Sequence, residues 1–359
     1  MPSDTTWRFY TRSAEAWEAM HADCAAAREC IDIEQYIFGT DEIGKRFFEL
    51  LKRKKREGVH VRIICDAVGS FDLLNSDIEK VLVAEGIEIR FFNPIKPWRI
   101  GNISSWFRRD HRKLLLVDKA IAYTGGVGIE DRMANWRDTA VRMVGPVVME
   151  TQNDFDQMWT NLPRRTFARL RPMSRDGEEF SFLTNSPRFH RRYIYHDLRK
   201  AIRQAKKYIY LASPYFVPSI KIFTSLRKAA RRGVDVRILL SKTSDVHIAD
   251  VATGSYFLLA LHAGIKIYLY DHATVFHAKT GAIDDIWGSV GSANIDNLSL
   301  LLNFEGNIKS SDPEFVAELK RQFVEDLSGA RMVEKSEWIQ RPFLLKIMEV
   351  ITWPIHGIL

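Results

Sequence analysis

Hydrophobic and polar positions follow two different periods along this 359-residue chain, and the same succession of periods occurs twice. Stretches with apolar residues three or four apart predict helices, and stretches with apolar residues at alternate positions predict strands. The predicted helices run over 12–30, 41–57, 76–85, 192–206, 220–232 and 250–263. The predicted strands run over 31–38, 59–64, 87–92, 208–212, 234–239 and 265–270. Strands that alternate with helices in both halves favour an α/β sandwich in each half.

A short motif, H-x-K-x4-D, stands at the corresponding place in each half. The first copy is His111-Arg-Lys113-Leu-Leu-Leu-Val-Asp118, and the second is His277-Ala-Lys279-Thr-Gly-Ala-Ile-Asp284. Side chains two positions apart on a strand share a face, so each copy is expected to place an imidazole beside an ammonium. That pair suits a phosphate, because the ring can attack phosphorus or carry a proton while the lysine neutralises the oxygens. One copy alone could be a buried histidine beside a surface lysine; two matched copies argue against that interpretation.

Two kinds of acidic residue accompany the motifs. Asp118 and Asp284 lie an odd number of positions after the histidine and the lysine, so on a continuing strand they face away from the phosphate. We therefore expect them to be structural residues in turns. Asp138 follows His111 at nearly the interval at which Glu305 follows the second histidine. A carboxylate that returns in this way is the kind of group that orients a catalytic imidazole.

With these motifs and their flanks, the chain resembles the phospholipase D superfamily and, more narrowly, bacterial cardiolipin synthases in a short form without N-terminal transmembrane helices. The flanks that carry the narrower resemblance are Tyr36-Ile-Phe38, Gly58-Val-His-Val-Arg62, Trp136-Arg-Asp-Thr139, Pro214-Tyr-Phe-Val-Pro218, Gly291-Ser-Ala-Asn-Ile-Asp296 and Asn303-Phe-Glu305. The resemblance implies two tandem phospholipase D-like α/β sandwich halves, related by pseudo-two-fold symmetry, with the active site between them. We expect a first half over 1–160, a linker over 161–180, a second half over 181–330 and an amphipathic tail over 331–359.

The resemblance also implies a two-step mechanism. By analogy with the family's usual order, His111 is the nucleophile and His277 the acid and base, although the residues themselves do not decide between the two rings. Lys113, Lys279 and Asn294 are expected to hold the phosphate, and Asp138 and Glu305 to orient the imidazoles. Gly128 stands where many relatives have an asparagine, so the first half is expected to lack that donor. The two lysines supply positive charge, so we expect neither a metal nor another cofactor.

The first half carries an insertion over 93–109 that the second half lacks. Tryptophan beside arginine suits a lipid–water interface, whereas an ordinary loop would pack its aromatic residues inward. The residues expected at the membrane are Trp98, Arg99, Trp106, Phe107, Arg108 and Arg109. A helix over 341–353 would carry one narrow polar stripe, so it either lies on a membrane or covers a groove of its own protein.

Composition narrows the function without deciding it. A net charge of +7 favours an anionic partner, either acidic lipid or nucleic acid. The three cysteines form no CxxC motif and fit a reducing compartment. Neither a secretory signal nor a spanning helix is expected.

We therefore expect a peripheral enzyme on the cytoplasmic face of the cell membrane that makes cardiolipin from phosphatidylglycerol through a phosphatidyl-histidine. Its partners would be an anionic phospholipid substrate and the membrane surface, without nucleic acid. The sequence leaves the oligomeric state open. The alternatives are a phospholipase D that forms phosphatidic acid, a nuclease of the same superfamily and a non-catalytic lipid-binding scaffold. The intact motifs argue against the scaffold, and the tryptophan-rich insertion argues against the nuclease.

Overall fold

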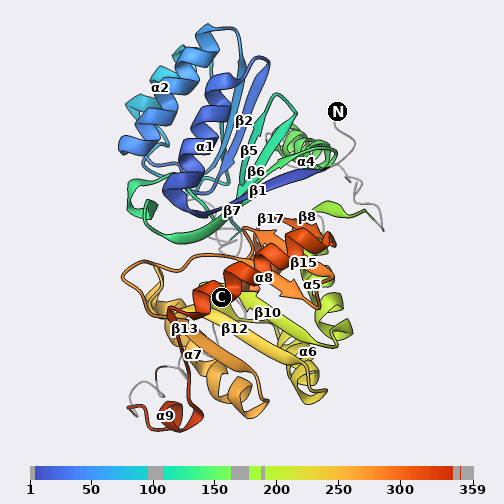
Figure 1. Ribbon diagram of the computed structural model, residues 1–359. Helices are drawn as coiled ribbons and strands as arrows, with labels where there is room; N and C mark the ends of the chain where they lie inside the picture. The colour runs from blue at the N-terminus through green and yellow to red at the C-terminus, as the bar shows by residue number, and fades with distance from the viewer. Residues whose placement is uncertain (1–4, 96–107, 163–177, 187–190, 343–347, 349–359) are drawn as a thin grey trace.

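The computed structural model describes residues 5–95, 108–162, 178–186, 191–342 and 348. Within these ranges the chain forms two α/β halves, one above the other in Figure 1. The helices of the first half are α1 (Ser13–Ala26), α2 (Glu42–Arg56), α3 (Asp77–Ala84) and α4 (Val147–Asn161). Those of the second half are α5 (Tyr193–Gln204), α6 (Ile220–Arg231), α7 (His247–His262), α8 (Pro313–Leu327) and α9 (Lys335–Ile339). A 3-10 turn at Asp131–Met133 and a π-helical turn at Leu298–Leu302 complete the helical segments of these ranges.

Each half is built on one mixed β-sheet. The first sheet contains β1 (Thr6–Arg12), β2 (Cys30–Gln35), β3 (His60–Asp66), β4 (Glu88–Phe92), β5 (Lys113–Val117), β6 (Ile121–Gly125) and β7 (Arg137–Val144). The second contains β8 (Phe180–Ser186), β9 (Arg191–Arg192), β10 (Tyr208–Ala212), β12 (Asp235–Ser241), β13 (Lys266–Tyr270), β14 (Thr280–Ile283), β15 (Trp287–Gly291), β17 (Glu305–Ser310) and β18 (Ala330–Met332). The short strands β11 (Phe216–Val217) and β16 (Ile295–Asp296) pair separately.

The two sheets share one strand order. It is β1-β7-β6-β5-β2-β3-β4 in the first and β8-β17-β15-β14-β10-β12-β13 in the second, where β9 and β18 add one strand at each edge. In both halves the three strands at one end run parallel, and the strands that carry the motifs join them antiparallel. The expected fold of two repeated α/β halves is therefore confirmed.

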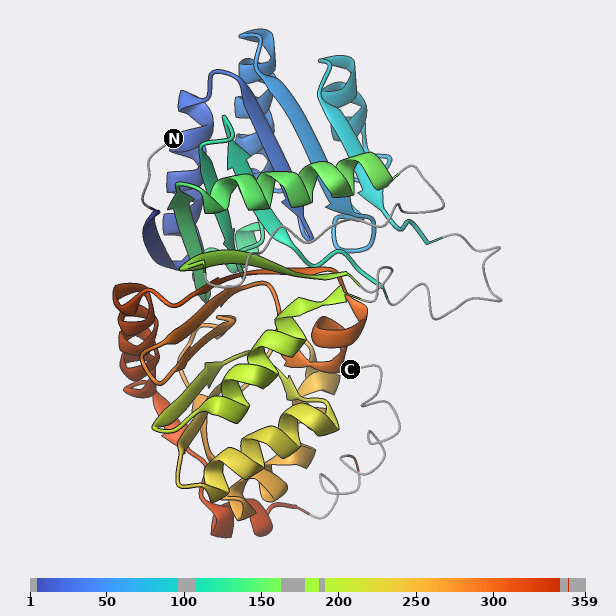
Figure 2. The same ribbon diagram turned by 90° about the vertical axis from the view of Figure 1, so that its right-hand side faces the viewer.

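Three buried clusters hold the layers together. One lies between the first sheet and α1 and α2, and another lies between the second sheet and α5, α6 and α7. The third joins the halves: it contains α4, which crosses the first sheet in Figure 2, and α8 together with residues of both sheets. Trp7 and Phe9 of β1 also pack their rings against Phe315 of α8. Residues of both sheets are thus buried in the contact between the halves.

The periods predicted most elements to within a few residues, but they missed β1. Its sequence, Thr-Trp-Arg-Phe-Tyr-Thr-Arg, alternates in period two, but residues 6–11 belong to no predicted element and only Arg12 falls in the predicted helix over 12–30. The strand pairs antiparallel with β7, so the edge position explains its polar alternate residues. Residues 331 and 332, expected in the tail, belong instead to β18, which pairs with β13.

Several predicted segments lie wholly or largely outside the described residues. They include most of the linker over 161–180, most of the insertion over 93–109 and most of the helix over 341–353. The described part of the tail holds α9, where Trp338 packs its ring 4.5 Å from that of Phe257 on α7. Among the described residues, we find no helix that has both the length and the apolar character needed to cross a bilayer.

Candidate active site

The two motif histidines lie where the halves meet, just before their strands. The prediction that they lie on strands was wrong: β5 begins at Lys113 and β14 at Thr280. Each histidine segment is instead held by a backbone bridge to the other half. His111 N donates to Phe304 O at 2.9 Å, and His277 N donates to Arg137 O at 2.8 Å. The residue that accepts each bond directly precedes a buried carboxylate, so the bridges bring carboxylate and histidine together.

Each imidazole is paired with the carboxylate of the opposite half. His111 Nδ1 lies 3.1 Å from Glu305 Oε1, and His277 Nδ1 lies 2.6 Å from Asp138 Oδ2. An ionised carboxylate can only accept, so Nδ1 carries the proton in both pairs. Nε2 therefore remains available for chemistry on each ring. The sequence indicated which carboxylates would matter, but it did not indicate that the pairs cross between the halves.

The two motif lysines are also buried at the site. Lys113 Nζ donates to His111 O at 2.9 Å, and Lys279 Nζ donates to His277 O at 2.6 Å. Burial and the neighbouring Lys279 lower the pKa of Lys113 to about 7. Burial likewise lowers the pKa of Lys279. Nearby carboxylates, Glu305 and Asp138 among them, offset this effect only in part, and a bound phosphate would add negative charge.

An aromatic ring flanks each histidine. Tyr36 lies edge-on to His111 with the ring centroids 4.9 Å apart, and Trp136 lies edge-on to His277 at 5.0 Å. Tyr36 directly follows β2, whose last residue is in register with Lys113, which explains how it reaches the site. These rings restrict the rotation of the imidazoles and exclude water from one side of each. In the sequence these two aromatics were notable only as part of the family flanks.

The halves differ in the loops that follow β6 and β15. The Ser292 hydroxyl donates to Glu305, whereas the corresponding residue of the first half is Gly126. A Cβ atom at Gly126 would lie only 2.1 Å from Asp138 Oδ1, so the carboxylate occupies the space of the missing side chain. The buried Asn294 carbonyl Oδ1 has no hydrogen-bond partner among the described residues, while Gly128 stands at the equivalent place. The sequence places Ser292 opposite Gly126 but does not indicate that its hydroxyl bonds to Glu305.

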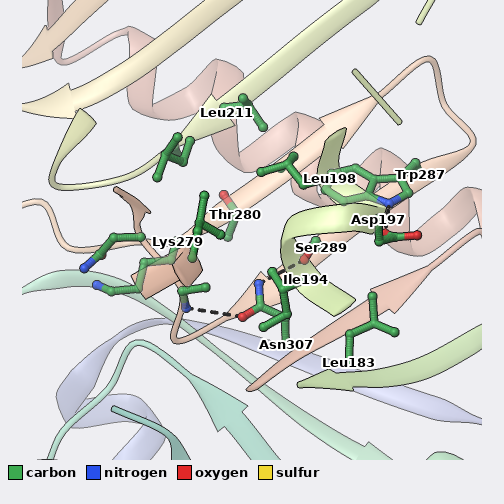
Figure 3. A pocket seen from close by; sticks show the side chains of 16 residues that line it. Leu183, Ile194, Asp197, Leu198, Leu211, Lys279, Thr280, Trp287, Ser289 and Asn307 are labelled. Carbon is green, nitrogen blue, oxygen red and sulfur yellow. Dashed lines mark hydrogen bonds between the residues drawn. The ribbon is translucent and has the colours of Figure 1, made fainter. Parts of the chain in front are cut away.

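A cavity of about 340 Å³ opens in front of both histidines. Residues of both halves line it. From the first half these include Tyr36, Ile37, His111, Lys113 and Trp136, and from the second Tyr215, Asp245, His277, Asn294 and Asp296. Figure 3 shows a second, smaller cavity within the second half, lined by Lys279, Ile194, Leu198, Leu211, Asp197 and Asn307 among others but by neither motif histidine. The larger cavity is therefore the one that could hold a substrate against the two rings.

The electrostatic surroundings of the two rings are unequal. Burial lowers the pKa of both histidines. The Asp138 and Asp245 carboxylates raise the pKa of His277 against the effect of Lys279. For His111, the Glu305 carboxylate acts against both lysines. The two rings therefore differ in their charged neighbours, two carboxylates and one lysine at His277 against one carboxylate and two lysines at His111, while the pKa of both is lowered.

The two motif aspartates, Asp118 and Asp284, hold turns of the backbone. The Asp118 carboxylate accepts from the backbone N–H groups of Arg28, Glu29 and Cys30, and the Asp284 carboxylate accepts from those of residues 206–208. Both aspartates have positive φ, in turns that join the motif strand to the next strand. Neither lines the cavity.

Arg109 is not a membrane residue, contrary to the prediction. It is only 7% exposed, and its guanidinium donates to Asp66 at 3.2 Å and to the Asn93 carbonyl at 3.0 Å. Since it also lines the cavity, its charge belongs to the site rather than to the outer surface. Arg108 remains partly exposed. Trp98, Arg99, Trp106 and Phe107 lie outside the described residues.

Known proteins resemble this chain over nearly its whole length. The model of the family described as cardiolipin synthase, PLD-like domain, matches residues 21–159 and 198–327. A cardiolipin synthase of Geobacillus kaustophilus is 35% identical over 95% of this chain and 70% of its own length. The major cardiolipin synthase of Bacillus subtilis is 31% identical over 97% of this chain and 74% of its own length.

Solved structures share the fold at low sequence identity. A phosphatidylserine synthase of Haemophilus influenzae superimposes with a TM-score of 0.74 over 98% of this chain and 94% of its own, at 12% identity. A polyphosphate kinase of Porphyromonas gingivalis gives a TM-score of 0.63 over 94% of this chain and 50% of its own, also at 12% identity. The extent of the family match, the relatives above 30% identity and the repeated fold agree. The chain belongs to the family of cardiolipin synthases with a phospholipase D-like domain.

Proposed function

We propose that the protein is a phosphatidyltransferase that makes cardiolipin from phosphatidylglycerol. The observation that carries this proposal is a pair of imidazoles, His277 buried and His111 partly buried, that are each held at Nδ1 by a carboxylate and face one cavity. Two such rings suit a two-step displacement at phosphorus, with one ring as nucleophile and the other as acid and base. The cardiolipin synthases among the relatives favour phosphatidylglycerol as the substrate.

In the first step, Nε2 of His111 attacks the phosphorus of one phosphatidylglycerol. The bond from phosphorus to the glycerol headgroup oxygen breaks, and His277 gives its proton to that oxygen. In the second step, a hydroxyl of another phosphatidylglycerol gives its proton to His277 and bonds to phosphorus. The bond between phosphorus and His111 then breaks, so the nucleophile is regenerated. The assignment of the acid follows the family's order; at His277, Asp138 and Asp245 act to raise a pKa that burial lowers overall, and so help the ring to carry a proton.

The phosphate in this mechanism is held by cationic and polar side chains. Lys113 and Lys279 each use Nζ to bond the backbone carbonyl of their own histidine, which fixes them beside the reacting rings. Negative charge on the phosphoryl oxygens would restore the protonated state of Lys113, whose pKa lies near 7 without it. Asn294 adds a side-chain amide from the second half, and Gly128 offers none from the first.

We also propose that the enzyme works as a peripheral protein on the cytoplasmic face of the membrane. Phe71, in the loop after β3, is 70% exposed, and Ile95, near the start of the insertion, is 50% exposed. Both follow strands whose carboxyl ends approach the site, because β3 ends at Asp66, which contacts Arg109 of the cavity wall. Apolar side chains there suit insertion among lipids, and Trp98, Trp106 and Phe107 of the insertion would add to that surface.

The decisive experiment is incubation of the purified protein with phosphatidylglycerol labelled in its acyl chains. We expect labelled cardiolipin, with glycerol released. Phosphatidic acid as the sole product would replace the proposal by a phospholipase D that uses water, and unchanged lipid would exclude both activities.

A further inference from the structure

The two walls of the cavity differ in chemistry, although the fold repeats. Phe38 bridges to Ile129 in the first half just as Phe216 of β11 bridges to Ile295 of β16 in the second. By this match, Ile37 corresponds to Tyr215, and both residues line the cavity. The first wall therefore presents an alkyl group where the second presents a phenol.

A carboxylate accompanies that phenol. Asp245 lies in the loop between β12 and α7, lines the cavity and accepts a hydrogen bond from the Tyr215 hydroxyl. The equivalent loop after β3, over 67–76, is described in full and contributes no residue to the cavity wall. Asp245 thus gives the second wall a carboxylate that the equivalent loop of the first half, over 67–76, does not supply.

Asp245 is ionised and stays a hydrogen-bond acceptor. Asp245 is exposed to solvent. Partial removal from water opposes its ionisation, but the nearby His277 and the Tyr215 hydroxyl hold its pKa below the usual value. Burial and the adjacent carboxylate raise the pKa of Tyr215, so the phenol keeps its proton and remains a donor. One carboxylate offers about four acceptor positions, so the bond from the phenol leaves room for others.

We propose that Asp245, positioned by Tyr215, binds the second hydroxyl of a vicinal diol whose first hydroxyl is the acceptor at His277. The inference rests on the proposed function and deepens it, because it assigns the acceptor to the second wall and names its chemical class. A 1,2-diol headgroup engages both groups together, whereas water and a simple alcohol engage only His277. Asp245 is therefore a specificity-determining residue that favours transfer over hydrolysis.

The chemistry balances without another reactant. The acceptor hydroxyl gives its proton to Nε2 of His277, its oxygen bonds to phosphorus, and the phosphorus–His111 bond breaks. The neighbouring hydroxyl keeps its own proton and donates it in a hydrogen bond to Asp245. A carboxylate also discourages a second phosphate at this wall, which places the acceptor's phosphate elsewhere.

The experiment offers phosphatidylglycerol as donor with equal concentrations of 1,2-propanediol and 1-propanol as soluble acceptors, and the two phosphatidyl alcohols are quantified. The wild type should prefer the diol by about tenfold or more, the difference expected when a hydrogen bond to a charged group is lost. Asp245→Asn should bring the ratio close to one, and Tyr215→Phe should lower it by a smaller factor. Asp271→Asn is the matched control, because that exposed residue pairs with Lys242 in the same half and does not line the cavity.

The outcomes separate this inference from the proposed function. Without added alcohol, the ratio of cardiolipin to phosphatidic acid should fall about tenfold in Asp245→Asn while donor is still consumed. An unchanged diol preference in both the Asp245 and the Tyr215 variants would overturn the inference, although cardiolipin synthesis would stand. In a parallel reaction that offers ethanolamine and 1,2-propanediol at equal concentration, a preference for the amine that is lost in Asp245→Asn would overturn the inference in favour of an amine site. Phosphatidic acid as the wild type's sole lipid product would instead overturn the proposed function.

Discussion

Replacing Gly126 with alanine should damage catalysis through a single steric contact. Gly126 is fixed by its N–H bond to Thr139 O at 3.0 Å, and its φ is not in the left-handed region. Alanine is thus compatible with the backbone, but its Cβ would lie 2.1 Å from Asp138 Oδ1. Ordinary packing needs more than 3 Å, so the carboxylate must retreat by roughly 1 Å from a bond to His277 that is now 2.6 Å long.

A displacement of this size has a defined kinetic cost. A misplacement of about 1 Å in a catalytic arrangement reduces the rate by roughly 10²-fold, which we expect for kcat of Gly126→Ala. Retreat of the carboxylate also weakens its effect on the ring. Asp138 raises the pKa of His277, so its retreat lowers that pKa. The acid then loses its proton at lower pH, and the high-pH limb of the kcat profile should move to lower pH.

The assay is initial-rate formation of cardiolipin across a pH series, with circular dichroism and thermal melting to confirm the fold. Ser292→Ala is the matched control, because it puts the same residue at the equivalent place in the other half. There a Cβ is already present, so no new steric contact arises; the hydroxyl bond to Glu305 and the bond accepted from Gly306 N–H are lost, and kcat should fall by less than about tenfold. A Gly126→Ala enzyme with wild-type kcat and pH profile would refute the reasoning that the added Cβ displaces Asp138 and that the contact of Asp138 with His277 matters.

Four further predictions concern other parts of the protein. His111→Ala and His277→Ala should each abolish turnover with an unchanged circular dichroism spectrum, and full activity in either variant would exclude the two-histidine mechanism. Activity should survive EDTA, because the motif lysines can supply the positive charge; loss in EDTA with recovery on adding a divalent ion would contradict this. Lys113→Met should abolish activity yet raise the thermal midpoint by about 5 °C at pH 7. Burial lowers the pKa of the Lys113 amine to about 7 in the folded protein, so at every pH below its ordinary pKa the amine binds protons more readily in the unfolded state and destabilises the fold. That gain should shrink as pH rises towards 10, and a constant gain would show that burial of charge is not its cause. Alanine at both Trp98 and Trp106 should weaken co-sedimentation with anionic vesicles even in high salt, and wild-type binding would move the membrane surface elsewhere.

The sequence predicted the elements of this fold well because apolar residues recur at regular helical or strand spacing in both halves. The antiparallel strand β1 was missed, since seven residues ahead of an alanine-rich helix carry a weak signal. At the site, H-x-K-x4-D fixed which side chains would gather, and the repeated interval identified the two carboxylates. The crossing of His111 to Glu305 could not be predicted, because it depends on how the two sheets face each other. Arg109 was misplaced for a similar reason: its partner Asp66 is distant in the sequence, so its burial leaves no local pattern.

The crossed pairing also governs when the enzyme becomes chemically competent during synthesis. His111, Lys113 and Tyr36 are all synthesised with the first half, but Glu305 follows His111 by 194 residues. Until β17 has been made and paired with β15 and β8, the first imidazole lacks its carboxylate and the cavity lacks its second wall. A nascent or truncated chain beside a bilayer is therefore unable to cleave the surrounding phospholipids, and this safeguard requires no inhibitor or processing step.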